Sequence, residues 1–370
     1  MTSPITDLLD YHIRAGHTPG GLVHVERAGR TLARVVAGRI RPDDDAPLHE
    51  GVRYRIASLT KPMVTLAALM QVGEGRLDLD APVGQLLPAL RDLRLAAGQA
   101  PKSAPTVRDL MRHTSGLAYP YEIADAGLRK AWSDAALSPG ASGTRAADFL
   151  ARLAGLPLVA EPGTAFRYGY STDVLGCIVE QIDGVPLGQA LQRRLFTPLG
   201  MRHTGFEVLA GEPTPMAPAD DKAWHAMVPG IGLRKPGQPC MDAGGGGLLS
   251  TLDDVLAFGR CIAQGGQAGG QRLVSEPLFA ELSRNQLPAG VDGPAGYCGS
   301  GFGFGLGFAV RLDWGPSAMP CTPGELTWSG ISGTALFVQP RDQWVAVMFT
   351  ANMASRMMAR MEFRRAAGRV

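Results

Sequence analysis

The sequence predicts an α/β fold of the α+β kind: an antiparallel sheet built from both termini and flanked by helices, with a largely helical second domain. Segments with the alternating pattern of strands lie near both ends of the chain, and segments with helical periodicity lie between them. Such strands share one sheet only if the two ends of the chain come together. With 370 residues, the chain can build two domains with a full core. We expect a sheet-containing domain at 1–75 and 300–370, a mostly helical domain at 76–299, and the active site at their junction.

The first elements are a helix and a hairpin. Residues 5–15 have an amphipathic helical pattern, and two strands at 20–39 flank a turn at residues 28–30. An extended segment is expected to end near residue 56. A helix with apolar residues at helical spacing is expected to follow it, up to residue 75. Pro62 fits that helix only near its start, where a missing N–H costs little.

The middle of the chain contains helix-start signals. Thr106 and Asp109 have the spacing of a capping box, and Thr251 and Asp254 repeat that spacing before another helix. Residues 207–240 are rich in Pro, Gly and Ala, which predicts a surface loop.

The C-terminal part returns to strands and closes with a helix. Strands are expected at 304–312, 324–330, 334–340 and 343–350, and the helix at 354–369. This helix carries five arginines: Arg356, Arg360, Arg364, Arg365 and Arg369. They could indicate a contact with a membrane surface, but we interpret them as the solvated face of a helix that lies on the sheet.

The amino-acid composition of the chain bears on whether it binds nucleic acids, membranes or metals. A net charge of +2 and the absence of a Lys/Arg block give no reason to expect a nucleic-acid partner. The apolar runs are too short for a membrane span, and the N-terminus lacks the pattern of a signal peptide. Five scattered cysteines without a C-x-x-C pair predict reduced thiols and a cytoplasmic location. No HExxH or zinc-type spacing occurs, so we expect no metal and no cofactor; the oligomeric state stays open.

The chemically most informative stretch is Ser58-x-x-Lys61 at the start of the 56–75 helix. A serine hydroxyl is a weak nucleophile unless a neighbour removes its proton, and a lysine with a lowered pKa can do so. Residues three apart lie on the same side of a helix. The positive end of the helix also stabilises the charge that develops when the serine attacks.

The alternative reading makes Ser58 an ordinary N-cap and Lys61 a solvated residue of the first turn. With 16 serines and 5 lysines in the chain, chance predicts about 0.2 such pairs. The G-x-S-x-G signature of α/β-hydrolases is absent, which favours Ser58 by elimination. Ser115 has no lysine at helical spacing and is interpreted as a turn residue.

Two further segments could complete a serine acyl-transfer site. In FRYGYST (166–172), Tyr168 or Tyr170 could shuttle a proton beside a cationic lysine, although a packed aromatic pair is the plainer interpretation. Trp328-Ser329-Gly330 ends a predicted strand, and a strand edge there could donate a backbone N–H to an oxyanion. The alternative for this segment is a core tryptophan followed by a turn.

In this order, these pieces resemble the serine β-lactamase and penicillin-binding superfamily, and most closely class C β-lactamases and family VIII carboxylesterases. The resemblance covers most of the chain and includes the runs at 113–117, 161–176, 197–206, 244–258 and 326–334. It implies a β-lactamase-like fold. It also implies that Ser58 is the acylated nucleophile, Lys61 its base partner and Tyr168 the second acid/base. The oxyanion hole would be the backbone N–H groups of Ser58 and Ile331.

The chain departs from β-lactamases at two positions. Their Tyr-x-Asn motif is matched by Tyr168-Gly169-Tyr170, and their Lys-Thr-Gly motif by Trp328-Ser329-Gly330. The lysine that helps bind a substrate carboxylate is therefore missing. We expect substrate contacts from Tyr170, Trp328, Ser329 and Gly330.

Both departures favour a small-molecule ester substrate, cleaved at a short- to medium-chain acyl group through a covalent acyl-enzyme. The alternatives are a β-lactamase, amidase or acyltransferase that uses the same machinery. A catalytically silent penicillin-binding-like scaffold protein is the non-enzymatic alternative.

Overall fold

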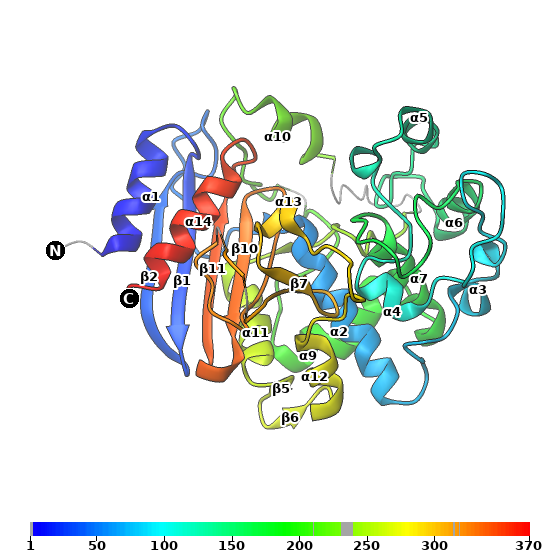
Figure 1. Cartoon of the computed structure of the whole chain (residues 1–370). Helices are drawn as coiled ribbons and strands as arrows, with labels where there is room; N and C mark the ends of the chain where they lie inside the picture. Colours follow the sequence, from blue (N-terminus) through cyan, green and yellow to red (C-terminus); the bar gives the residue numbers. More distant parts are fainter. Residues whose placement is uncertain (1–2, 210, 231–239, 314, 318) are drawn as a thin grey trace.

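A seven-stranded antiparallel sheet forms one side of the molecule (Figure 1). The computed structural model describes residues 3–209, 211–230, 240–313, 315–317 and 319–370. The strand order is β2-β1-β11-β10-β9-β8-β7. The bounds are β1 Gly20–Arg27, β2 Arg30–Gly38, β7 Phe302–Phe304, β8 Ala309–Arg311, β9 Leu326–Ser329, β10 Thr334–Gln339 and β11 Trp344–Thr350.

The two ends of the chain meet in the middle of this sheet. Strand β1 pairs directly with β11, and Leu22 lies opposite Phe349 in that pairing. The predicted antiparallel sheet built from both termini is therefore confirmed. The single strand predicted at 304–312 is wrong, because the chain turns between β7 and β8. Gly307 lies there with φ +83°, and its Cα faces the side chain of Thr65, so a Cβ would not fit.

Helices cover both faces of the sheet. Helix α11 (Leu252–Ala263) lies on the Leu336 side of β10, since Gly259 contacts Leu336. Helix α14 (Arg356–Ala367) lies on the opposite side, since Phe363 packs against Phe337. Helix α1 (Pro4–Arg14) lies beside α14 (Figure 1).

The arginines of helix α14 do not form one solvent-exposed face. Arg360 and Arg364 are buried, whereas Arg365 and Arg369 are exposed. The prediction of a solvated face is therefore wrong for the two middle arginines. Their turns of the helix face the sheet, and each guanidinium finds hydrogen-bond acceptors there.

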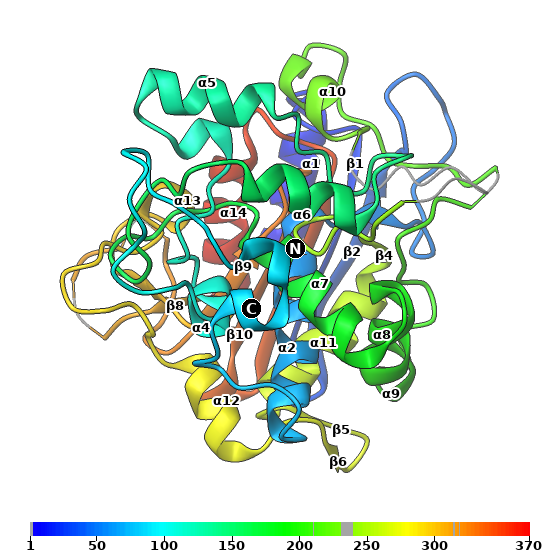
Figure 2. The same cartoon turned by 90° about the vertical axis from the view of Figure 1, so that its right-hand side faces the viewer.

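Most of the remaining helices gather on the other side of the molecule (Figure 1). Helix α2 (Thr60–Gly73) lies between the sheet and this group in both views (Figures 1 and 2), and it packs against α7. The group comprises α3 Val83–Leu86, α4 Val107–Met111, α5 Ala126–Asp134, α6 Ala146–Ala154, α7 Ser171–Asp183 and α8 Leu187–Leu191. Helices α9 Thr197–Leu199 and α12 Glu276–Ser283 lie at the lower middle of Figure 1, and α13 Ala295–Cys298 lies beside β7. The domain bounds stay a prediction, and α11, which lies inside 76–299, packs on the sheet.

Both predicted helix starts occur. The Thr106 side chain accepts from the backbone N–H of Asp109, and the Asp109 carboxylate accepts from the N–H of Thr106, which completes the capping box. The side chain of Thr251 likewise accepts from the N–H of Asp254. These caps satisfy amides that have no acceptor within their own helix.

The segment predicted as a surface loop at 207–240 contains a helix, α10 (Lys222–Met227). Asp221 caps it, and the second carboxylate oxygen accepts from the N–H groups of Met353 and Ala354 at 2.7 and 2.9 Å. A single aspartate thus ties α10 to the link between β11 and α14. Residues 210 and 231–239 of the predicted loop lie outside the described residues.

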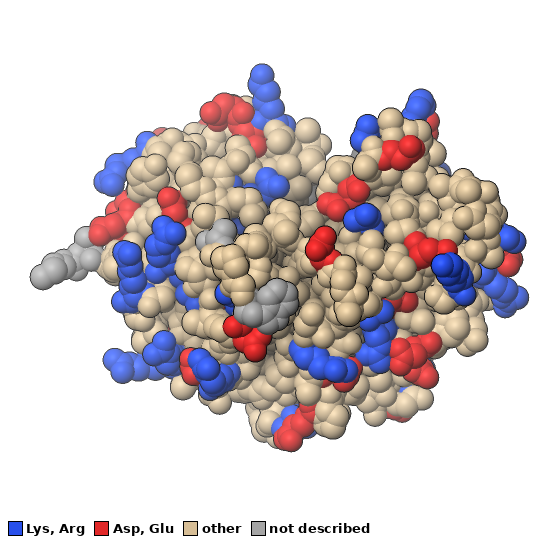
Figure 3. All heavy atoms as spheres, viewed as in Figure 1, with Lys and Arg blue, Asp and Glu red and all other residues tan. Residues whose placement is uncertain are grey.

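Charges are mixed on the face seen in Figure 3, where lysines and arginines alternate with aspartates and glutamates. In the described part of the chain, no helix combines the length and apolarity needed to cross a membrane.

A buried ion pair joins α14 to the sheet and gives a test of the fold. Arg364 donates two hydrogen bonds to Glu325, at 2.7 and 2.6 Å, and Glu325 is fully buried. We predict that Glu325→Gln lowers the free energy of unfolding by about 3–5 kcal/mol, because it leaves a buried cation without its anion. Chemical denaturation measures this change.

The double variant Glu325→Leu/Arg364→Met should recover most of that loss, since it removes both charges. The exposed Arg365→Gln on the same helix should change stability by no more than about 0.5 kcal/mol. Equal destabilisation by Glu325→Gln and Arg365→Gln would contradict the structural role of the pair.

Candidate active site

Ser58 lies in a sharp turn between a strand and the buried helix α2. The short strand β3 (Tyr54–Arg55) precedes it, and one 3₁₀ turn (Ala57–Leu59) leads into α2. Ala57 has φ +46°, a region that non-glycine residues seldom adopt. The hydroxyl of Thr60 donates to the Ala57 carbonyl at 2.7 Å and fixes the turn. Ser58 is half-buried at this corner, where the first amides of the helix have no intrahelical acceptor.

The side chain of Lys61 is buried beside Ser58. Its residue is 1% exposed, and its Nζ lies 3.4 Å from Ser58 Oγ. Nζ also donates to Tyr119 Oη at 3.3 Å and to the Gly245 carbonyl at 2.5 Å. These three acceptors match the three donors of an ammonium group. The amine therefore has a fixed position next to the hydroxyl that it would deprotonate.

Asp173 is a buried carboxylate that interacts electrostatically with the Lys61 amine. It is 1% exposed, and its Oδ1 accepts from the Gly245 N–H at 2.9 Å. Burial raises the pKa of Asp173 to about 6, while the Lys61 charge lowers it. At neutral pH Asp173 is consequently an anion that offsets the buried charge of Lys61.

Gly245 links Asp173 to Lys61 through its backbone. A Cβ at this position would lie 2.4 Å from Asp173 Oδ2, so only glycine permits the contact. The glycine run 244–247 belongs to the segment 244–258 that carries part of the family resemblance. Its N–H and C=O groups hold the carboxylate and the amine of the site.

Tyr168 and Trp328 come together against Lys61. Lys61 Nζ lies 4.5 Å from the centre of the Tyr168 ring, and Trp328 Nε1 donates to Tyr168 Oη at 3.3 Å. This hydrogen bond fixes the position of the phenol oxygen beside the Lys61 amine. Trp328 is buried, and its indole N–H contacts Tyr168, a contact that its position at a strand end did not indicate.

Tyr119 is a site residue that the sequence analysis missed. Besides accepting from Lys61, it donates its N–H to the Tyr168 carbonyl at 3.0 Å. Its position shortly after the HTSGL run was the one available signal. Tyr170 packs its ring 4.7 Å from that of Tyr119 and donates its hydroxyl to the Leu137 carbonyl at 3.2 Å. Its role as a substrate contact stays a prediction.

The strand end at Ser329-Gly330-Ile331 lies against the Ser58 turn. Thr334 Oγ1 donates to the Ile56 carbonyl at 3.1 Å, and Ser332 Oγ donates to the Arg55 carbonyl at 2.5 Å. A Cβ on Gly330 would lie 2.3 Å from the Ile56 oxygen. The Ile331 N–H donates to none of the described residues.

These contacts bring Gly330 and Ile331 to the residues that precede Ser58. The two expected oxyanion donors, the N–H groups of Ser58 and Ile331, therefore belong to segments that pack directly against each other. Ser329 is half-buried at the same edge. The roles of all three residues toward a substrate stay predictions.

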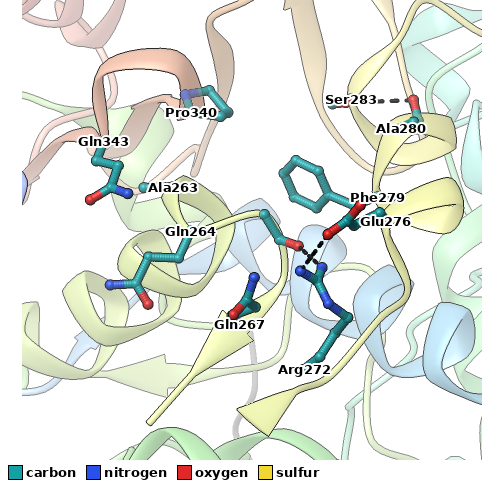
Figure 4. Close-up of a pocket in the computed structure, with 11 residues that line it drawn as sticks. Ala263, Gln264, Gln267, Arg272, Glu276, Phe279, Ala280, Ser283, Pro340 and Gln343 are labelled. Atoms are coloured by element: carbon teal, nitrogen blue, oxygen red, sulfur yellow. Dashed lines mark hydrogen bonds and ion pairs between the residues drawn. The ribbon is translucent and has the colours of Figure 1, made fainter. Parts of the chain in front are cut away.

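A separate hollow of about 660 Å³ lies near the hairpin β5 (Gln267–Ala268) and β6 (Gln271–Arg272), and Ser58 is not among the residues that line it (Figures 1 and 4). Arg272 in its wall is ion-paired with Glu276 at 2.9 Å and donates to the Gly265 carbonyl at 3.2 Å (Figure 4). Ser283 there donates weakly to the Ala280 carbonyl at 3.5 Å and contacts no base. This hollow thus lacks an activated nucleophile.

Known proteins with the same fold include esterases and acyl-transfer enzymes. Esterase EstB from Burkholderia gladioli is 32% identical over 373 residues, which covers 96% of this chain and 91% of that protein. The solved structure described as EstCE1, a hydrolase with promiscuous acyltransferase activity, matches with a TM-score of 0.81 and 27% identity over 98% of this chain and 97% of that one.

The unliganded simvastatin synthase LovD from Aspergillus terreus matches with a TM-score of 0.77 over 100% of this chain and 99% of that chain. At 21% identity, this match speaks for the fold alone. Residues 5–369 match the family described as Beta-lactamase. The predicted β-lactamase-like fold is therefore confirmed, and the chain belongs to the Beta-lactamase family.

Proposed function

We propose that this protein is a serine carboxylesterase of the family VIII kind, which cleaves short- to medium-chain esters through an acyl-enzyme on Ser58. The observation that carries the proposal is the 3.4 Å contact between Lys61 Nζ and Ser58 Oγ at the start of a buried helix. The similarity to esterase EstB over 96% of the chain supports an ester as the substrate.

The chemistry proceeds by proton transfer and acyl transfer. Lys61 first releases the proton of its ammonium form to solvent. The neutral amine then accepts the Ser58 proton while Oγ attacks the ester carbonyl carbon. The carbonyl oxygen becomes an oxyanion held by the N–H groups of Ser58 and Ile331. Collapse of this intermediate breaks the C–O bond. Tyr168 gives its phenolic proton to the departing alkoxide and regains a proton from the Lys61 ammonium group beside it. Water then attacks the acyl-enzyme by the reverse route and releases the acid.

The surroundings of Tyr168 favour neutral substrates. Trp328 occupies the place where β-lactamases carry a lysine, and its indole offers an apolar wall with one N–H, which Tyr168 accepts. A carboxylate on the substrate would find no ammonium group from this strand. This supports esters over penicillins and cephalosporins.

The cytoplasm is the compartment that we propose for the protein. Its five cysteines are scattered and odd in number, a usage typical of reduced thiols. Burial raises the pKa of Cys177 and Cys261, which keeps both thiols protonated and poorly reactive.

The nucleophile assignment can be tested by covalent labelling. We predict that a serine-directed fluorophosphonate labels the wild-type protein on Ser58, and that Ser58→Ala abolishes both labelling and hydrolysis of p-nitrophenyl esters. Peptide mass spectrometry locates the label, and circular dichroism checks that the variant is folded. Ser115→Ala serves as the matched control and should keep its labelling. A label on a serine other than Ser58 would refute the proposed function.

The proton relay predicts a graded series of variants. Lys61→Ala and Tyr168→Phe should each lower kcat by roughly 10²–10⁴-fold, the range for a lost acid or base. Tyr119→Phe removes one hydrogen bond to an ammonium group and should cost about 10–100-fold. Steady-state kinetics with p-nitrophenyl butyrate measures the series.

Tyr170→Phe is the control within this series, since its hydroxyl contacts the Leu137 carbonyl instead of the amine. It should change kcat much less than the other three variants. If Tyr170→Phe were as damaging as Tyr168→Phe, the acid/base role would belong to the other tyrosine of the loop.

If the substrates are neutral esters, the protein should cleave an ester more efficiently than a cephalosporin. We expect kcat/KM for p-nitrophenyl butyrate to exceed that for a chromogenic cephalosporin by at least about tenfold, because no ammonium group from the strand binds the cephalosporin carboxylate. Trp328→Lys should raise the cephalosporin-to-ester ratio. A wild-type cephalosporin rate at or above the ester rate would replace the esterase assignment with a β-lactamase.

Because Trp328 also donates to Tyr168, Trp328→Phe is needed as a control. It keeps an aromatic wall, loses the N–H and adds no cation. Both rates should fall together in Trp328→Phe, by about three- to tenfold, with their ratio unchanged. An unchanged ratio in Trp328→Lys would refute the carboxylate argument alone.

A further inference from the structure

Arg360 on α14 carries a buried charge that is paired with no carboxylate among the described residues. The residue is 4% exposed, and its Nη2 donates to the Gly330 carbonyl at 2.5 Å. Its Nη1 contacts Met357 Sδ at 3.4 Å, and its Nε has no partner among the described residues. Arg364, one turn further on, is paired with Glu325 in the usual way. A buried guanidinium without a carboxylate is strongly unfavourable, which calls for an explanation.

The unfavourable burial of this charge lowers the pKa of the Arg360 guanidinium. Burial, and after it the nearby charge of Arg356, lower the pKa of Arg360 to about 9. Arg360 therefore remains a cation at neutral pH, although its surroundings disfavour the charged form. Arg356 itself donates to the Met353 carbonyl, at 2.5 Å, so it also brings no negative charge to this region.

The acceptor of Arg360 identifies what the charge can do. The carbonyl of Gly330 and the N–H of Ile331 belong to one peptide group, since the C–N bond between these residues joins them. A cation at the carbonyl oxygen draws electron density toward that oxygen, which makes the N–H at the other end a stronger donor. Gly330 O accepts a second hydrogen bond from the Gly333 N–H at 3.2 Å, which adds to the polarisation.

The donor end of this peptide group is free. The Ile331 N–H has no acceptor among the described residues, and Gly330 lies against the Ile56 carbonyl, two residues before Ser58. A polarised and unpaired N–H next to the nucleophile is suited to bind an oxyanion.

We propose that Arg360 is a positioning residue that strengthens the oxyanion hole by polarising the Gly330–Ile331 peptide group. The inference rests on the proposed function, in which Ile331 donates to the oxyanion formed on attack by Ser58. Arg360 does not touch the substrate. Its charge stabilises the transition state more than the bound ester, because only the transition state carries the full negative charge on oxygen.

A series of three substitutions separates charge from size. Arg360→Lys keeps a cation near the Gly330 carbonyl, Arg360→Gln keeps a neutral donor, and Arg360→Met keeps only the bulk of the side chain. We expect kcat for p-nitrophenyl butyrate to fall in that order, by a few-fold for Lys and about 10–100-fold for Gln and Met, with KM changed less than about threefold. Arg365→Gln, the exposed charge on the same helix, should leave both constants unchanged.

A transition-state mimic provides the readout that a merely structural role would not move. An aryl trifluoromethyl ketone adds to a catalytic serine and forms a tetrahedral oxyanion, whereas the ether analogue of the substrate binds without reaction. Affinity for the ketone should fall by the same factor as kcat across the series, while affinity for the ether stays constant. Equal losses for the ketone and the ether, or greater activity for Met than for Lys, would overturn the proposal.

A spectroscopic measurement covers the case in which Arg360→Met does not fold. The infrared stretch of a ¹³C-labelled acyl carbonyl on Ser58 reports the strength of the donors around its oxygen. We expect this band at a higher wavenumber in Arg360→Lys and Arg360→Gln than in the wild type, and an unshifted band would refute the inference. If the wild type forms no acyl group on Ser58, the proposed function fails as well; if it does and the Arg360 series is flat, only this inference fails.

Discussion

The buried amino group of Lys61 is the constraint around which the rest of the site is arranged. With 1% of its residue exposed, water cannot solvate the charge, so the protein must supply every acceptor. The acceptors come from three distant parts of the chain: Ser58, Tyr119 and the carbonyl of Gly245. Asp173 adds the opposite charge through its contact with the Gly245 N–H. The arrangement around Lys61 therefore forms only when these separate segments have packed together.

Hydrogen bonds from hydroxyl groups to backbone carbonyls attach the sheet to the turn that contains Ser58. Ser332 and Thr334, at the start of β10, donate to the carbonyls of Arg55 and Ile56, just before the strained residue Ala57. The turn that presents Ser58 is thus fastened to strands that begin some 270 residues later in the chain. These contacts bring together the two segments that carry the proposed oxyanion donors, Ser58 and Ile331.

The parts of the molecule that could be predicted are those encoded by local patterns. The hairpin at 20–39, the caps at Thr106 and Thr251 and the pair Ser58/Lys61 depend on residues close in sequence, so periodicity and spacing reveal them. The contacts of Tyr119, Asp173 and Arg360 depend on tertiary packing, and none of these residues has a distinctive local pattern. The missed helix α10 was hidden by Pro- and Gly-rich flanks, and its cap, Asp221, is anchored by the N–H groups of a segment more than a hundred residues away.

The buried charges around Ser58 have different consequences for the stability of the resting protein and for the proposed reaction. Two buried cations, Lys61 and Arg360, flank the Ser58 corner, and Asp173 offsets the first of them. The charge of Arg360 is left without an anion in the resting protein, which lowers stability. In the mechanism that we propose, the oxyanion formed on attack by Ser58 supplies the missing negative charge at the far end of the Gly330–Ile331 peptide group. The electrostatic strain present before the reaction is then relieved at the transition state, so the destabilised resting arrangement itself lowers the barrier to acylation.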